Sequence, residues 1–105
     1  MLNAATAPSP SPLPPLQAAN FLNLLIIDDD LVIRDAAQEV GHSLGFSTHI
    51  ADSPGHVFRL IDSAHIDAVL LDLRFAGGNG LETLENIKRH RNDAVVIVVT
   101  GFASV

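Results

Sequence analysis

Carboxylate and hydroxyl side chains directly follow the apolar runs of this sequence. The runs and the polar residues after them are Leu24–Ile27 with Asp28, Asp29 and Asp30, Ala68–Leu71 with Asp72, and Val95–Val99 with Thr100. Continuous runs of Val, Ile and Leu suit strands buried on both faces of a parallel sheet. Ligands bind such sheets outside the carboxyl ends of the strands. We therefore expect these polar side chains to converge at one edge of a sheet.

Converging carboxylates have a definite chemistry. The charges of Asp28, Asp29 and Asp72 would repel one another and raise at least one pKa unless a cation neutralises them. Magnesium suits such a site because it uses one or two carboxylates, phosphate oxygens and several waters. With the ion in place a carboxylate can act as nucleophile toward a phosphoryl group and form an aspartyl-phosphate. Thr100 is placed to donate a hydrogen bond to a phosphoryl oxygen.

Composition limits the class of protein. The chain has 105 residues, enough for one domain. Residues 1–20 are rich in Pro, Ala and Ser and predict a disordered arm, which leaves residues 21–105 for the folded domain. No signal peptide and no run approaching the roughly 20 apolar residues of a membrane helix is present, so we expect a soluble chain with no membrane partner.

Charge and cysteine content narrow the class further. The net charge of −6 argues against binding of nucleic acid by this segment. The absence of cysteine excludes disulfides and thiolate metal sites, and it fits a cytoplasmic protein.

Strand and helix patterns alternate after the arm. Asp30 is expected to cap an amphipathic helix, with Gly45 as its left-handed C-terminal residue. The apolar positions of this helix are Ile33, Ala36, Ala37, Val40 and Leu44. Ser53 and Pro54 have the types expected at the N-cap and first position of a second helix.

The remaining segments complete the pattern. We expect a short edge strand over Phe46–Ala51, a strand that ends at Asp72, a third helix from Leu81 and a last strand over Ala94–Val99. The order β-α-β-α-β-α-β predicts an α/β fold with right-handed crossovers and a doubly wound parallel sheet.

Four motifs in this order resemble the receiver domain of bacterial two-component response regulators. They are Leu25-Ile26-Ile27-Asp28-Asp29-Asp30, Val69-Leu70-Leu71-Asp72-Leu73-Arg74, Gly80-Leu81 and Val98-Val99-Thr100-Gly101. The resemblance runs from Leu24 to Val105, and its last six residues resemble receivers of the nitrogen-regulator type. It implies a flavodoxin-like receiver fold that lacks its last strand and helix, so that the domain is incomplete at its C-terminus.

The resemblance also implies a role for each site residue. Asp72 would be the phosphoacceptor. Magnesium would be held by Asp29 directly, by Asp28 mainly through water, by Asp72 and by the backbone carbonyl of Arg74. Thr100 would be the switch hydroxyl, and Gly101 would leave room for the phosphoryl group. Family receivers take phosphate from a histidine kinase or phosphotransfer protein and act on an output domain, here expected in a longer parent protein.

Two features depart from the family pattern. Phe75-Ala76 stands where the family usually has Met-Pro. The phosphate-binding lysine of the family lies at the end of a fifth strand, beyond Val105. The only lysine of this chain, Lys88, is expected near the opposite edge of the sheet.

Other interpretations remain open from the residues. Asp30 suits a helix cap better than a metal ligand, and Gly77-Gly78-Asn79-Gly80 predicts a turn because its spacing matches no P-loop. We expect no enzyme acting on other substrates, only self-phosphorylation and self-dephosphorylation. One rival is an aspartyl-nucleophile phosphatase, which needs a second acid where Arg74 stands. The other rival is a scaffold or decoy that binds partners without being phosphorylated.

Overall fold

Parallel strands form a single sheet in the computed structural model, which describes residues 21–99. The strands are β1 (Asn23–Ile27), β2 (Ser47–Ala51), β3 (Ala68–Asp72) and β4 (Val95–Val99). Their order across the sheet is β2-β1-β3-β4, and every pairing is parallel. The predicted edge position of the second strand is confirmed. The predicted arm over residues 1–20 and the site residues Thr100 and Gly101 lie outside the described part of the chain.

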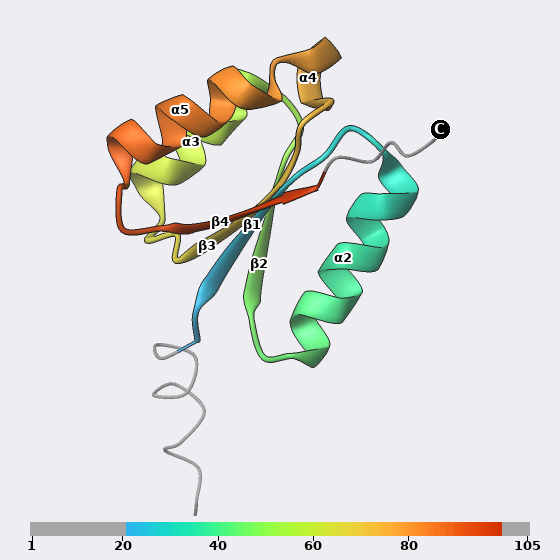
Figure 1. Cartoon of the computed structure of the whole chain (residues 1–105). Helices are drawn as coiled ribbons and strands as arrows, with labels where there is room; N and C mark the ends of the chain where they lie inside the picture. Colours follow the sequence, from blue (N-terminus) through green and yellow to red (C-terminus); the bar gives the residue numbers. More distant parts are fainter. Residues whose placement is uncertain (1–20, 100–105) are drawn as a thin grey trace, which may run out of the picture.

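Helices cover both faces of the sheet (Figure 1). They are α2 (Leu31–Ser43), α3 (Pro54–Ser63), the short α4 (Phe75–Gly78) and α5 (Gly80–His90). Helix α2 packs on β1 and β2, whereas α3 and α5 lie together on the opposite face. The doubly wound fold is therefore confirmed. Within residues 21–99 no helix has the length and apolar character required to cross a membrane.

The predicted helix boundary signals are present. The Asp30 side chain accepts hydrogen bonds from two backbone N–H groups in the first turn of α2, at 2.9 and 3.3 Å. Gly45 has φ of 96°, and the N–H of Phe46 reaches back to the carbonyl of Gly41 at 2.9 Å. This pattern satisfies carbonyls that the end of a helix otherwise leaves without partners. Ser53 caps α3 in the same way as Asp30 caps α2.

A continuous core fills the space between the sheet and the pair α3 and α5. Its fully or almost fully buried members are Leu25, Ile27, Ala51, Val57, Ile61, Ile66, Val69, Leu71, Phe75 and Ile87. Strand residues of this core alternate along β1 and β3, because side chains of a strand point to opposite faces in turn. The core therefore fixes the carboxyl ends of β1 and β3 beside each other.

On the opposite face, α2 does not bury the apolar positions that the amphipathic pattern predicted. Among the apolar positions of that helix, Ile33, Val40 and Leu44 are 47%, 56% and 71% exposed. The buried residue of α2 is Gly41, where an added Cβ would lie 2.9 Å from the Thr48 methyl carbon. The small residue lets α2 approach the sheet closely, and the larger apolar side chains are left on the surface.

Candidate functional site

Neighbouring strands β1 and β3 bring the predicted carboxylates together. Ile27 pairs with Leu71 in the sheet, so Asp28 and Asp29 continue from β1 beside the place where Asp72 ends β3. A pocket of about 480 Å³ lies at this end of the sheet. It is lined by Asp28, Asp29, Asp30, Ile33, Asp72, Arg74 and Val99. The structure thus gathers three predicted site carboxylates in one pocket.

Asp28 is the most buried of these carboxylates, with 7% of its surface exposed. Burial raises the pKa of Asp28, because a charge is less stable away from water. The backbone N–H of Asp30, which donates to Asp28 Oδ1 at 2.8 Å, lowers the pKa, while the negative charges of Asp72, Asp30 and Asp29 raise it. The net effect is a raised pKa of Asp28. The ionised form of Asp28 is therefore destabilised in the folded chain, and a bound cation would offset this destabilisation.

Backbone hydrogen bonds fix the other two carboxylates. The N–H of Arg74 donates to Asp72 Oδ1 at 3.0 Å, and the N–H of Ala76 donates to Asp29 Oδ2 at 2.9 Å. No residue among 21–99 donates a hydrogen bond to the second oxygen of either group. Each carboxylate is therefore held by one oxygen and keeps another for a ligand.

The turn after β3 creates the contact with Asp29. Ala76, Gly77 and Gly78 have φ of 54°, 72° and 104°. The predicted role of the glycines as positive-φ turn residues is confirmed for Gly77 and Gly78. Ala76 carries a Cβ, so its left-handed conformation costs about 1–2 kcal/mol. Proline could not replace it in this turn, because proline has φ near −65° and no N–H.

Gly80 is required by packing rather than by its backbone angles. Its N–H donates to the carbonyl of Leu73 at 3.2 Å, and an added Cβ would collide with the backbone of Leu73. The sequence placed Gly80 in the turn and α5 from Leu81, whereas α5 begins at Gly80. Its place in the Gly80-Leu81 motif was the available signal, but the close contact with Leu73 was not visible in the sequence. Ala76 had no such signal, because alanine is not a residue that favours positive φ.

The donor groups suit a hard cation that keeps its own water. Among residues 21–99, no three His, Cys, Asp or Glu side chains are arranged to hold a metal ion by themselves. Magnesium needs only one or two carboxylates and completes its shell with water and phosphate oxygens. The predicted carbonyl ligand, that of Arg74, accepts the N–H of Gly78 at 3.2 Å and retains its second lone pair. Asp29 and Asp72 each offer a free oxygen, and the buried charge of Asp28 would be stabilised by a cation, so this set of groups fits magnesium.

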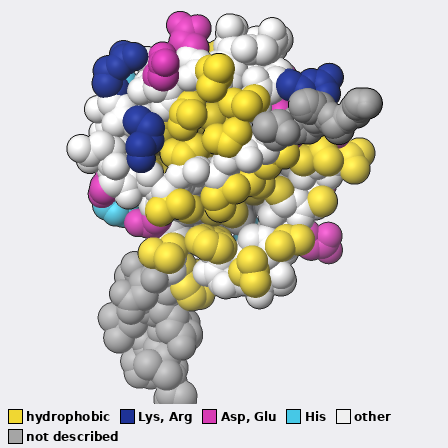
Figure 2. Space-filling view, in the orientation of Figure 1, with side chains coloured by type: hydrophobic (Ala, Val, Ile, Leu, Met, Phe, Trp, Pro, Cys, Tyr) yellow, Lys and Arg dark blue, Asp and Glu magenta, His cyan; other side chains and the backbone are white. Residues whose placement is uncertain are grey.

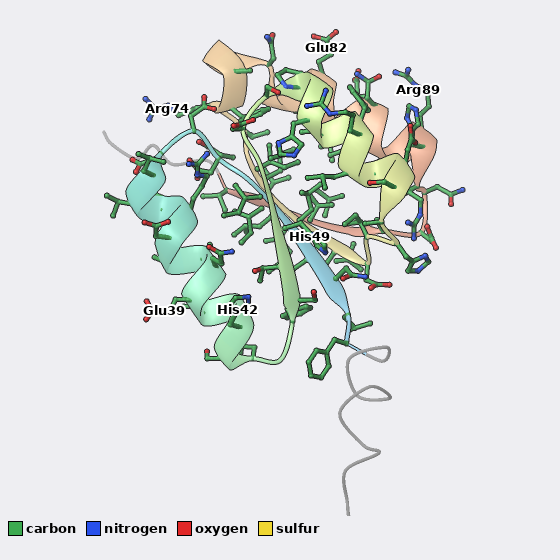
Figure 3. All side chains as sticks on the ribbon, turned by 180° about the vertical axis from the view of Figure 1, so that it is seen from behind. Glu39, His42, His49, Arg74, Glu82 and Arg89 are labelled. Atoms are coloured by element: carbon green, nitrogen blue, oxygen red, sulfur yellow. The ribbon has the colours of Figure 1, made fainter. Side chains whose placement is uncertain are left out.

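Two basic side chains, Lys88 and Arg74, lie at opposite ends of the sheet. Lys88 donates to the carbonyls of Ala94 at 3.0 Å and Asn92 at 3.3 Å, just before β4 begins. It lies at the amino end of the strands, away from Asp72, as predicted. Arg74 lines the pocket, and its exposed side chain extends outward at the end of the sheet where α2 starts (Figure 3).

Comparison with known proteins assigns the family. The family model for the response regulator receiver domain matches residues 24–105. The chain therefore belongs to the response regulator receiver domain family. The regulatory protein AtoC of Escherichia coli, a nitrogen-type regulator, is 30% identical over 82 residues, which cover 78% of this chain and 18% of AtoC.

Two solved structures extend the comparison. The MaeR response regulator bound to beryllium trifluoride has a TM-score of 0.70 at 28% identity, covering 80% of this chain and 70% of that one. The complex of histidine kinase ThkA with response regulator protein TrrA has a chain with a TM-score of 0.71 at 26% identity, covering 80% and 72%. The chain spans less than half the length of the curated relatives it matches.

Proposed function

We propose that this chain is a phosphoacceptor module in which Asp72 receives a phosphoryl group. The observation that carries the proposal is the position of Asp72 at the last residue of β3, in the same pocket as Asp28 and Asp29. Support comes from the relative MaeR, which binds beryllium trifluoride, a mimic of a phosphoryl group.

Each pocket residue has a separate role in this proposal. The free oxygen of Asp72 forms a bond to phosphorus, while the bond from phosphorus to the donor's nitrogen breaks and the donor keeps that electron pair. The N–H of Arg74 holds the other oxygen of Asp72 and so orients the nucleophile. Asp28 and Asp29, with the Arg74 carbonyl, would hold Mg²⁺, which would offset negative charge on the transferring group.

The phosphoryl group would then act through the end of the next strand. Val99, the last residue of β4, lines the pocket, and Thr100 follows it. A shift of the Thr100 hydroxyl toward the phosphoryl group, with Gly101 leaving space, would change the surface seen by an output domain. We expect the chain to act in the cytoplasm, with a histidine kinase or phosphotransfer protein as donor, in keeping with the complex formed by TrrA.

Turnover of other substrates is disfavoured by Arg74. The phosphatase interpretation needs an acid two residues after Asp72, but this position carries an exposed arginine whose N–H binds the nucleophile. We propose that the module only acquires and loses its own phosphoryl group. The scaffold interpretation is separated from this proposal by whether the folded chain is modified at all.

The test is the intact mass of the full chain after incubation with Mg²⁺ and acetyl phosphate. The expected result is a gain of one phosphoryl group, and no gain when Mg²⁺ is chelated before acetyl phosphate is added. Asp72→Asn should abolish the gain. Asp62→Asn is the matched control, because Asp62 is an exposed carboxylate on α3, remote from the pocket lining.

Two outcomes would reject this function. A folded wild-type chain that gains no mass would support the scaffold interpretation, and repeated release of phosphate from a phosphoester would support the phosphatase. Circular dichroism of each variant shows that the fold is retained, so a lost mass gain reports on chemistry.

A further inference from the structure

The side chain of Asn79 does not do what its position in the chain predicts. Asn79 is the N-cap residue of α5, and at an N-cap an asparagine side chain normally accepts a hydrogen bond from the first turn of the helix. Here it makes no such bond. Its Nδ2 group donates instead to the carbonyl of Ala76 at 3.0 Å. The side chain of Asn79 therefore serves the turn after β3 and not the helix that follows.

The backbone of Asn79 is fixed by buried residues. Its N–H donates to the carbonyl of Phe75 at 3.0 Å, and its carbonyl accepts the N–H of Thr83 at 2.9 Å and the Thr83 hydroxyl at 3.0 Å. Phe75 is completely buried, and Thr83 is 4% exposed. Asn79 is thus anchored to the core, which makes its side chain a firm support for the carbonyl of Ala76.

Ala76 is held by hydrogen bonds on both sides. Its carbonyl accepts from Asn79, and its N–H donates to Asp29 Oδ2 at 2.9 Å. Between these two groups its φ is 54°, a left-handed conformation that is unfavourable for a residue with a Cβ. The hydrogen bond from Asn79 offsets part of that cost. Asn79 therefore favours the conformation that brings the N–H of Ala76 to Asp29.

The turn offers Asp29 only neutral donors. Residues 75–80 include no charged side chain. Figure 2 accordingly shows mostly white atoms, which are backbone and uncharged polar side chains, at the top of the molecule, where Figure 1 places α4. A neutral N–H orients the carboxylate of Asp29 without cancelling its charge. The negative charge stays available to a cation in the pocket.

We propose that Asn79 is a positioning residue for the cation site: acting through Ala76, it holds Asp29 in the orientation that binds Mg²⁺. This inference rests on the proposed function, which assigns Asp29 as a magnesium ligand. Asn79 does not line the pocket, so it acts on the ion only through the turn. Loss of a group that hydrogen-bonds a ligating carboxylate typically weakens metal binding about tenfold or more. Asn79 lies one hydrogen bond further away, so its loss should cost less.

The first measurement is the dissociation constant of Mg²⁺ for the full chain, followed by the chemical shifts of its amide groups. Asn79→Ala should raise this constant by a factor of about three to ten, which corresponds to one lost hydrogen bond. Asn92→Ala is the matched control, because Asn92 is exposed at the opposite end of the sheet. Lys88 contacts only its backbone carbonyl, which the substitution keeps. This control should bind Mg²⁺ as the wild type does.

A second variant separates positioning through the turn from a general loss of structure. Glycine adopts positive φ without a steric penalty, so Ala76→Gly keeps the N–H but makes the turn less dependent on Asn79. The double variant Ala76→Gly with Asn79→Ala should therefore recover most of the lost Mg²⁺ affinity. In the absence of Mg²⁺, the N–H of residue 76 should exchange with solvent faster in Asn79→Ala than in the wild type. The double variant should restore its protection.

These results are distinguishable from those that test the proposed function. Mg²⁺ affinity and amide exchange are measured without a phosphodonor, whereas the proposed function is tested by the mass gain at Asp72. Equal Mg²⁺ affinities of Asn79→Ala and the wild type would overturn the inference even in a chain that is phosphorylated. A double variant that recovers no affinity, or a wild type that binds no Mg²⁺, would overturn it too. A loss that the double variant restores supports it even if Asp72 acquires no phosphoryl group.

Discussion

The two faces of the sheet carry the same kinds of residue but lie in different surroundings. Val69 and Leu71 point toward α3 and α5 and are completely buried. On the face that carries α2, Ile97 is 52% exposed, because α2 covers β1 and β2 and leaves the β4 side uncovered by residues 21–99. Figure 1 shows the paired helices on one side and the single helix on the other. Among residues 21–99, the apolar contacts therefore lie mainly between the sheet and α3 and α5, which we call the closed face; the face that carries α2 is called the open face.

The difference can be tested most strongly with neighbouring leucines of β3. Leu71 lies in the closed core, and Leu70 points to the open face and is half-buried. Leu71→Ala should lower the free energy of unfolding by about 2–5 kcal/mol, the usual range for deletion of a buried leucine side chain. Leu70→Ala should cost clearly less. Urea unfolding of the two variants measures both, and equal losses would show that the faces do not differ.

A second test concerns the contact between the closed face and the turn after β3. Gly80→Ala forces a Cβ into the backbone of Leu73, which should lower the free energy of unfolding by about 3 kcal/mol. Gly55→Ala is the control, because its Cβ would meet only the flexible end of Arg59 at 3.6 Å. That control should be neutral or slightly stabilising in the same urea experiment. A tolerant Gly80 would mean that α5 does not pack as closely as described.

The sequence was sufficient for the order of elements and for the closed face. Its apolar runs located the strands within one or two residues, and Asp30, Gly45 and Ser53 marked helix ends because their chemistry is local. It also indicated that carboxylates would meet at one sheet edge, because that follows from parallel strands alone.

What the sequence left open depends on tertiary contact. The exposure of Ile33 and Val40 and the close approach of Gly41 to Thr48 depend on how α2 sits on the sheet, which no periodicity reveals. The left-handed Ala76 could not be predicted, because its conformation is imposed by the surrounding turn and its N–H contact with Asp29. The roles of Thr100 and Gly101 stay predictions.

A third prediction concerns the strained backbone of Ala76, which follows Phe75, a residue of the core on the closed face. Ala76→Gly should raise the free energy of unfolding by about 1 kcal/mol, because glycine adopts positive φ without a steric penalty. Thermal or urea unfolding measures the gain. Ala76→Pro should instead destabilise the chain, since proline can neither adopt this φ nor donate to Asp29. A stabilising proline would show that the turn is not held as described.

The smallest effect concerns Asp28, whose charge is buried where the apolar core gives way to the pocket. Its pKa is raised above the ordinary value of 3.8, so the folded state favours the protonated form. Asp28 thus contributes stability below pH 3.8, and this contribution is lost as pH rises through its folded-state pKa. Asp28→Asn should be more stable than wild type at neutral pH, with an advantage that vanishes below pH 3.8.

Adding Mg²⁺ provides a control for this pH experiment. Because the ion would offset the charge of Asp28, millimolar-scale additions should reduce the advantage of Asp28→Asn at neutral pH. Unfolding curves across pH, with and without Mg²⁺, give the comparison. An advantage that grows on acidification would contradict the direction of the pKa change.

The central claim is that Asp72 in this pocket accepts the phosphoryl group, and locating the modified residue tests it most directly. The full chain is treated with Mg²⁺ and acetyl phosphate, reduced with borohydride and digested, and its peptides are sequenced by mass spectrometry. An aspartyl-phosphate is reduced to homoserine, so the account predicts homoserine at position 72 and unchanged aspartate at 28, 29 and 30. Homoserine at any of those positions, or none in a folded chain, would contradict it.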